Sequence, residues 1–527
     1  MISAYDVARQ TFVILLPEIL LILTATTMMT AGAFVKLPRH SWCATAAVAL
    51  GVALLVLLGS NAQTPDIYSA VALNDAFSFY GRILFLLSGL VVVALGHDQV
   101  DDGRASEFFG ALLFINAGAM LVAASNELVF LFVGLELVSI PTYLLLYLPR
   151  RSRETQEAVT KYFFLSIFSS GLLLFGFAYL YGMTGVSNLK ALAFLADRVQ
   201  GVPQPQFALI AIVFVVAGLG FRVAAVPFHF YAPDVYQGSP PLIAGLLSWV
   251  PKAVGFMAML RTVTAVISAA GTSGPLGHRA VLLAWLIAAI TMTLGNTVAL
   301  AQENLKRLFA YSSIAHAGYL MIGIAVAFRN DLASGGLFYG AEGIMFYLTA
   351  YAMMTLGAFG VIVMLSTPDR PVEKVEDLAG LSRTHPASAL AMAVFLFSLA
   401  GIPPLAGFWG KFELFAAAFS ASPGEDANLF WWLGLIAVLN SAAGAYYYLR
   451  IVVTMYLRTP TADALTAHPA WPSALVVALC AIGTVFVGIY PTPVIVATRQ
   501  AAESAIELPE PSGTTGAVAV TAAPALP

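Results

Sequence analysis

The sequence is poor in the residues that hold redox cofactors, nucleotides and metals. Its only two cysteines, Cys43 and Cys480, lie in separate apolar segments near opposite ends of the chain, whereas an iron–sulfur cluster is held by four thiolates. The seven histidines show no metal-ligand spacing, and no glycine-rich loop of the Rossmann or Walker type occurs. We therefore predict that this chain alone carries no cofactor and no metal, so that any soluble chemistry belongs to partner proteins.

Charge is also scarce. Only 10% of the 527 residues are charged and 60% are hydrophobic, and the mean hydropathy of +0.86 excludes an ordinary soluble domain. Runs of about 20 apolar residues recur, which is the length of a membrane-spanning helix, and strand-like alternation is absent. The first ten residues lack the basic region and cleavage site of a secretory signal, so the first apolar run is expected to be retained. The composition predicts an all-α polytopic membrane protein.

Apolar runs bounded by charges, glycine or proline predict about fourteen spans. They begin near residues 12, 42, 77, 107, 127, 157, 207, 241, 280, 306, 340, 387, 428 and 471. The loops after odd-numbered spans hold about twelve Lys and Arg residues, and the loops after even-numbered spans hold about five. By the positive-inside rule the first set of loops is expected in the cytoplasm and both termini on the opposite, periplasmic side.

Proline interrupts two of the apolar segments, at Pro227 in the seventh and at Pro403 and Pro404 in the twelfth. The two segments are five spans apart and cross in opposite directions, which is typical of an inverted repeat with its functional site at the repeat interface. We therefore expect helices seven and twelve to be broken. After Tyr490 the composition is rich in Ala, Pro, Thr and Glu without periodicity, which predicts disorder. The expected organisation is three N-terminal spans in residues 1–106, two inverted five-helix repeats in 107–265 and 280–458, a last span in 470–490 and a disordered tail in 491–527.

Four charged residues and one histidine stand inside apolar spans, where a charge costs about 2.5 to 3.5 kcal/mol on insertion scales. Glu136 and Lys252 lie about 13.5 and 16.5 Å into their spans, so both reach the midplane and could form one polar axis. Arg222 and His229 are seven residues apart on one helical face and could extend it, and Lys411 follows the second break. A lysine can release a proton, whereas arginine stays charged. The alternatives are a buried pair that only fixes helix packing, for Glu136 and Lys252, and side chains that satisfy carbonyls freed at a break, for the other three.

The remaining ionisable residues in the spans are expected to have lesser roles. Those near span ends read as interfacial or snorkelling side chains, namely Glu18, Arg82, Lys161, Glu342 and Arg450. Lys306 and Arg307 begin a span on the cytoplasmic side and are expected to fix topology. His316 is expected to contribute to packing.

Longer motifs resemble a known family. The segment 220–240, with its Asp-Val-Tyr-Gln-Gly stretch, resembles the antiporter-like subunits of respiratory complex I, the proton-pumping NADH:quinone oxidoreductase. Further matches are Gly-Leu-Glu-Leu at 134–137, Asn-Leu-Lys-Arg-Leu at 304–308, Tyr-Ser-Ser-Ile-Ala-His at 311–316 and the segment 401–412, which ends in Gly-Lys-Phe. The resemblance covers nearly the whole chain and is greatest to the subunit N branch.

The resemblance implies a proton-translocating subunit in the inner membrane of a bacterial cell, driven by electron transfer in other subunits. FMN, iron–sulfur clusters and quinone are expected in those subunits, and antiporter-like membrane subunits are expected as neighbours. Carried onto this sequence, Glu136 matches the family's fifth-span glutamate, Lys252 its eighth-span lysine and Lys411 its twelfth-span lysine. Arg222 departs from the pattern, because the family usually places lysine there.

Three alternatives stay open. A multisubunit cation/proton antiporter or a membrane-bound hydrogenase uses related subunits. The sister subunits L and M share the fold, although nothing after Tyr490 could form the lateral helix of subunit L. A stand-alone secondary transporter for an organic solute would be active without partners, whereas a complex I subunit would not.

Overall fold

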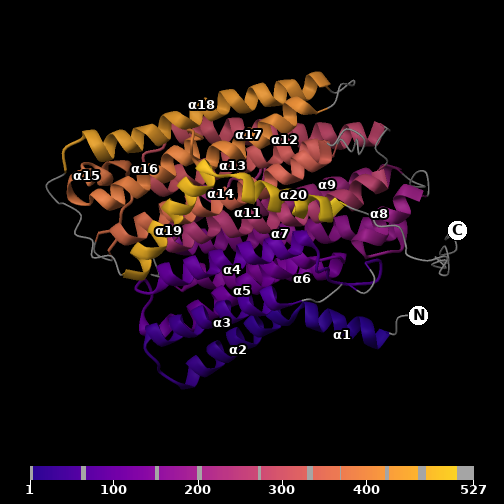
Figure 1. Ribbon diagram of the computed structural model, residues 1–527, viewed down its shortest axis with the longest axis horizontal. Helices are drawn as coiled ribbons and strands as arrows, with labels where there is room; N and C mark the ends of the chain where they lie inside the picture. Colours follow the sequence, from indigo (N-terminus) through magenta and orange to yellow (C-terminus); the bar gives the residue numbers. More distant parts are fainter. Residues whose placement is uncertain are drawn as a thin grey trace.

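The protein is a bundle of long helices that run side by side (Figure 1). The computed structural model describes residues 4–60, 64, 67–148, 153–198, 205–270, 275–328, 336–367, 370–421, 427–460 and 471–506. Within these residues the regular structure is helical, and the only β-type pairings are isolated bridges. Twelve of the described helices are long and apolar enough to cross a bilayer, and two further apolar helices, Phe207–Arg222 and Pro386–Ala400, are shorter. The expectation of an all-helical polytopic membrane protein is therefore confirmed.

The N-terminal half contains eleven of the α-helices in the described part of the chain. They are α1 (Ala4–Ile14), α2 (Leu16–Phe34), α3 (Arg39–Gly59), α4 (Ala76–Gly96), α5 (Ala105–Ala124), α6 (Leu128–Tyr147), α7 (Arg153–Thr184), α8 (Leu189–Arg198), α9 (Pro205–Arg222), α10 (Ala232–Gly238) and α11 (Pro241–Ala270).

The C-terminal half follows with α12 to α20. They are α12 (Pro275–Leu300), α13 (Leu305–Ala327), α14 (Gly336–Leu365), α15 (Leu381–Thr384), α16 (Pro386–Ala400), α17 (Ala406–Ser420), α18 (Ala427–Leu457), α19 (Trp471–Ile489) and α20 (Thr492–Ile506). In Figure 1 the helices α1 to α3 lie at the bottom of the bundle and α18 at the top.

Several of the long helices begin at a residue whose side-chain oxygen caps the helix. Asp75 accepts a hydrogen bond from the Ser78 amide at the start of α4, Glu127 from the Phe130 amide at the start of α6, and Asn304 from its third following amide at the start of α13. Each satisfies one of the amides that a helix start leaves without a partner, which stabilises the helix by about 1 kcal/mol. These caps fix where α6 and α13 begin and so set the depth of the residues further along them.

Glycine lets the central helices approach one another closely. A Cβ atom at Gly118 of α5 would lie 2.9 Å from the carbonyl oxygen of Gly134 on α6, and one at Gly318 of α13 would lie 2.4 Å from the amide nitrogen of Met292 on α12. The hydrophobic effect does not drive helices together in lipid. Small residues at such crossings allow the close van der Waals contact that does.

The interior of the bundle consists mainly of α5, α11, α13 and α14. In the most apolar stretches of α11 and α13, 94% of the residues are buried inside the protein, compared with 28% in α2. A charged residue on α11 or α13 therefore has to find its partners within the protein, since neither lipid nor bulk water reaches it.

One expectation about organisation was wrong. Residues 491–527 were expected to be disordered, but α20 occupies Thr492–Ile506 and packs against α4 and α14. Thr498, Ala501, Ala502 and Ala505 have at most 5% of their surface exposed, and their spacing forms one helical face. The face consists of small residues, which is why a search for large apolar residues misses it. Residues 507–527 lie outside the described part of the chain.

Candidate functional site

An ion pair in the interior joins α6 to the end of α9. The Arg222 Nη2 atom lies 2.6 Å from Oε1 of Glu136 and 3.0 Å from the Ser170 hydroxyl on α7, and that hydroxyl donates to the same carboxylate oxygen at 2.5 Å. Arg222 also donates to the Leu135 carbonyl at 3.4 Å. The Arg222 side chain is 5% exposed and that of Glu136 is 23% exposed. The cation is thus held by three acceptors, while the carboxylate keeps one side open.

Arg222 holds this position because α9 ends with it. The chain then runs without α-helix until α10 begins at Ala232. The Val226 amide donates to the Thr291 hydroxyl at 3.0 Å, and the Tyr231 hydroxyl donates to the Phe221 carbonyl at 2.9 Å. Side chains thereby satisfy backbone groups that the break in the helix would leave without partners.

His229 lies within this non-helical segment but stands apart from the charged residues. Its side chain is half-buried, and its Nδ1 atom has no hydrogen-bond partner. Among the described residues, no hydrogen bond joins it to Glu136, Arg222 or Lys252. The structure therefore does not bring His229 into the cluster that the sequence suggested.

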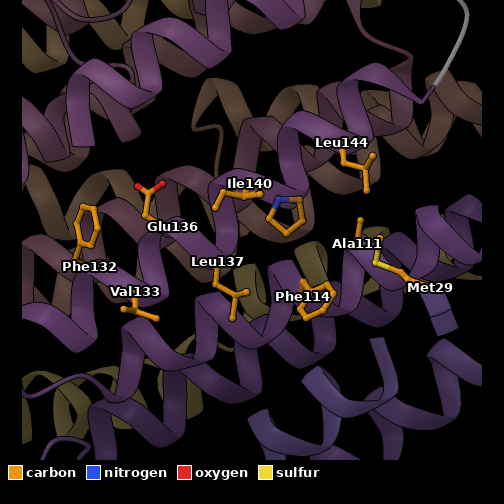
Figure 2. Close-up of a pocket in the computed structure, with 10 residues that line it drawn as sticks. Met29, Ala111, Phe114, Phe132, Val133, Glu136, Leu137, Ile140 and Leu144 are labelled. Atoms are coloured by element: carbon orange, nitrogen blue, oxygen red, sulfur yellow. The ribbon is translucent and has the colours of Figure 1, made fainter. Parts of the chain in front are cut away.

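Glu136 is one of the residues that line an apolar groove between α2, α5 and α6. The groove has a volume of about 460 Å³ and is lined by Met29, Phe114 and Ile140 among others, with Glu136 at its edge. Figure 2 shows the Glu136 carboxylate as the only acidic group among the labelled lining residues.

A small cavity separates Arg222 from Lys252 on α11. Both residues line it, together with Tyr162, Tyr231 and Tyr236. Its volume of about 10 Å³ is near the minimum that holds one water molecule, and its lining is polar enough to bind one. The gap between the two cations can therefore be bridged by water.

Lys252 is 2% exposed and has neutral partners. Its ammonium group donates a short hydrogen bond to the Ser313 hydroxyl on α13, which lies 3.1 Å from the Tyr236 hydroxyl. Pro251, the residue before it, stands inside α11. No carboxylate among the described residues forms an ion pair with Lys252.

His316 lies between the two lysines of the interior. Its Nδ1 atom makes a short hydrogen bond with the Tyr347 hydroxyl, and its Nε2 atom lies 2.8 Å from the Tyr448 hydroxyl. On α13 it stands between Ser313, which bonds to Lys252, and Tyr319, whose ring lies beside Lys411 and 5.7 Å from the His316 ring. The sequence reading of His316 as a packing residue missed this position, because a single histidine on an apolar helix gives no signal of its neighbours.

Lys411 takes its partners from the second break. Its Nζ atom lies 3.0 Å from the carbonyl oxygen of Ala400, the last residue of α16, and 3.0 Å from the Ser441 hydroxyl on α18. It also stands 5.2 Å from the centre of the Tyr319 ring. Gly401 makes the break possible, since its φ of 86° is a conformation that favours glycine. The end of one half-helix thus provides the acceptor for the lysine of the other half.

Two of the ion pairs that lie outside this row involve α4. Glu18 of α2 and Arg82 of α4 were expected to be interfacial or snorkelling residues, but both are fully buried and form an ion pair at 2.7 Å. The expectation was wrong because each residue lies near a span end in sequence, whereas α5 and its neighbours cover both in the fold.

The second pair is at the start of α4, just outside the span. Arg261 donates to both carboxylate oxygens of Asp75 at 2.7 Å and to the Ala123 carbonyl. Burial by itself would raise the pKa of the Asp75 carboxyl, but the Arg261 guanidinium outweighs it and the pKa lies below its usual value. This pair ties α4, α5 and α11 together at one end of the bundle.

A cluster of basic residues fixes α10. Lys161 and Arg307 lie 2.6 and 2.8 Å from the Asp234 carboxylate, and Lys306 donates to the Gln237 carbonyl at 2.6 Å. Lys306 is 7% exposed. These contacts hold the short helix that follows the break after Arg222.

The chain was compared with known proteins. Residues 125–441 match the model of the family described as NADH:quinone oxidoreductase/Mrp antiporter, transmembrane. The chain belongs to this family. NADH-quinone oxidoreductase subunit N of Trichlorobacter lovleyi is 37% identical over 494 residues, which are 93% of this chain and 96% of that protein.

Solved structures give the same result. A chain of respiratory complex I from Thermus thermophilus with bound aureothin is 32% identical, has a TM-score of 0.74, and the match covers 92% of this chain and 99% of that one. A chain of the Mrp complex from Dietzia sp. has a TM-score of 0.78 at 19% identity, over 94% of this chain and 98% of that one, which shows a shared fold alone. The resemblance found in the sequence motifs is therefore confirmed.

Proposed function

We propose that this chain is a proton-translocating membrane subunit of an NADH:quinone oxidoreductase, as its subunit N relatives are named. The observation that carries the proposal is the row of ionisable side chains from Glu136 through Arg222, Lys252 and His316 to Lys411, which lie on buried helices with hydroxyl groups between them. Ionisable groups at such positions in a membrane are retained where ions move. The chain itself performs no redox chemistry, and the electron carriers belong to partner subunits.

The helices support a finer architecture. Twelve spans and the two shorter apolar helices make fourteen, with α9 and α10 forming one interrupted span and α16 and α17 another. Residues 107–265 and 280–458 then form two inverted repeats around the charged row. The arginine and lysine content of the loops favours periplasmic termini in a bacterial inner membrane.

In this mechanism Lys252 and Lys411 carry protons. Each is bound by neutral acceptors, so an ammonium group can give up its proton and leave an amine that still hydrogen-bonds with a serine hydroxyl. Arg222 is a fixed cation, because its guanidinium cannot lose a proton in a protein. Glu136 is the switch: when it holds Arg222 the field at Lys252 is weaker, and when it releases Arg222 the field is stronger.

A neighbouring subunit at the groove beside Glu136 would control whether Glu136 holds Arg222. Other membrane subunits of the complex are the expected neighbours, and one that brings a cation to the groove would compete with Arg222 for the carboxylate. The relatives do not favour a multisubunit antiporter, a hydrogenase or a stand-alone transporter. His229 remains a proposed contributor on sequence grounds alone.

Pumping by the complete complex tests the proposal. Lys411→Met and Lys252→Met complexes, reconstituted in proteoliposomes, should oxidise NADH with a much lower number of protons moved per NADH than the parental complex. Lys374→Met, which removes an exposed loop lysine, is the matched control and should pump normally. Parental pumping by the Lys411→Met complex would exclude Lys411 as a carrier.

A further inference from the structure

A second group of charged residues lies on α14, α17 and α20, away from the row that ends at Lys411. The Arg499 Nε atom of α20 is 3.3 Å from Oε2 of Glu342 on α14, and the side chains are 53% and 5% exposed respectively. Glu413 of α17 is partly buried, its Oε2 atom is buried without a hydrogen-bond partner, and the charges of Glu342 and Arg499 act on it. The group therefore extends from the interior to the surface of the chain.

The two glutamates are brought together by a close approach of their helices. A Cβ atom at Gly343, the residue after Glu342, would lie 3.4 Å from the backbone nitrogen of Leu414, the residue after Glu413. On α4, the Tyr80 hydroxyl bonds to Thr349 at 2.5 Å, and the Glu413 charge acts on Tyr80 as well. The helices α14 and α20 are neighbours in the bundle (Figure 1).

Charge balance indicates what the group can do. The group has two carboxyl groups and one guanidinium, so it carries an excess negative charge when all three are ionised. A buried carboxyl group that lacks a partner takes up a proton more readily than one held in an ion pair. Glu342 has its ion pair with Arg499, whereas Glu413 has an unsatisfied oxygen. Glu413 is therefore the member of the pair that takes up and releases a proton.

The seam between α14 and α17 connects this group to the charged row. Tyr347, whose hydroxyl bonds to His316, packs on Gly410, where a Cβ atom would lie 2.5 Å from its ring. Gly410 is one helical turn before Glu413 on α17. Lys411, two positions before Glu413, points to the other side of the helix, because two residues turn a helix by about 200°.

We propose that Glu413 and Glu342 form the proton-release site of this subunit, on the periplasmic side of Lys411. The inference rests on the proposed function and on the orientation proposed with it, in which α17 ends toward the periplasm. A proton that leaves the row converts the Glu413 carboxylate to a carboxylic acid, and the same proton then leaves to the outer aqueous phase and restores the carboxylate. Arg499 compensates the charge of Glu342 through their ion pair, so that Glu413 alone takes up the proton.

α20 fixes the position of Arg499. Lys190 donates to the Ala505 carbonyl at 2.8 Å, and the Phe77 amide donates to the Ser504 hydroxyl at 2.9 Å. These contacts attach the C-terminal end of α20 to α8 and α4. The helix therefore presents the guanidinium to Glu342 from the exposed side of the bundle.

The test uses the complete complex in proteoliposomes at matched complex content, with protons moved per NADH oxidised as the readout. Glu413→Gln should lose coupled pumping, and Glu413→Asp should recover it in part with a shifted dependence on outer pH. Glu503→Gln removes an exposed carboxylate from α20 and is the matched control, which should pump normally. Arg499→Lys should pump better than Arg499→Met.

The outcomes separate this site from the function on which it rests. If the Glu413 carboxylate serves packing alone, the Glu413→Gln complex should pump at the parental ratio, since glutamine keeps the volume and removes repulsion from Glu342. That result, with pumping lost in Lys411→Met, would overturn the release site and leave the proposed function standing. Parental pumping in both variants would overturn the proposed function itself. Failure of Glu413→Asp to recover any pumping in an assembled complex would also count against a proton-carrying role.

Discussion

Arg222 allows a sharp test of the charged row, because its substitution by lysine separates charge from geometry. Arginine contacts Glu136, Ser170 and the Leu135 carbonyl at once. Lysine keeps the positive charge but not the planar fork, so it cannot hold all three acceptors with the same geometry. The loss of one or two hydrogen bonds from a charged group costs about 1.5 to 3 kcal/mol each, of which lysine recovers part through its own contacts. Arg222→Lys should therefore retain substantial pumping.

Arg222→Met removes the charge as well. Breaking a fully buried ion pair costs about 3 to 5 kcal/mol, and the 23% exposure of the Glu136 side chain places this pair at the lower end. The missing cation also changes the field at Lys252. The interaction energy of two unit charges falls inversely with distance, from about 4 kcal/mol at about 4 Å with an effective dielectric constant of about 20, and every ~1.4 kcal/mol is about a tenfold change in the proton-loaded population of the lysine. Coupled pumping should fall much further than in Arg222→Lys.

The assay is proton movement per NADH oxidised in matched proteoliposomes with equal complex content. The ionic-strength dependence of the two variants is a second readout, because a buried charge effect is little screened by salt. If Arg222→Met pumps as well as Arg222→Lys, the charge has no role and Arg222 serves packing alone.

Three further substitutions test other parts of the structure. Glu136→Gln keeps the Ser170 hydrogen bond but cannot balance Arg222, so proton movement per NADH should fall; normal pumping would exclude the switch. Gly401→Ala should lower the thermal stability of the complex by about 1 to 2 kcal/mol, since φ at this residue is 86°, whereas Gly59→Ala meets nothing within 4 Å and is the control. Asp75→Asn should destabilise the protein at neutral pH. Because the folded-state pKa of Asp75 is depressed, its contribution is present above about pH 4 and is lost as the pH falls through the folded value; thermal unfolding should show the two proteins converging only in acid.

The sequence predicted an all-helical polytopic membrane protein, for physical reasons. Apolar runs have to match the bilayer thickness, and charges within them are rare enough to stand out. The two interrupted segments were visible because proline and glycine are the residues that break a helix. Contacts between side chains of different helices were harder to predict. In the sequence Glu18 and Arg82 read as span-end residues, and only the packing of α2 and α4 around α5 shows that they are paired and buried. The face of α20 was missed because alanine and threonine give it little hydrophobic signal.

The partners of the buried cations differ according to whether the cation can lose its proton. The arginines of the interior each have a carboxylate partner: Arg222 has Glu136, and Arg82 has Glu18. The two lysines of the row have only hydroxyl and carbonyl partners among the described residues, Ser313 for Lys252 and Ser441 with the Ala400 carbonyl for Lys411. A carboxylate would hold a lysine in its charged form, whereas a neutral acceptor binds the ammonium group without requiring it to stay charged. In the proposed mechanism the end of α16 is therefore part of the carrier, since it supplies a carbonyl where a continuous helix would have none to offer.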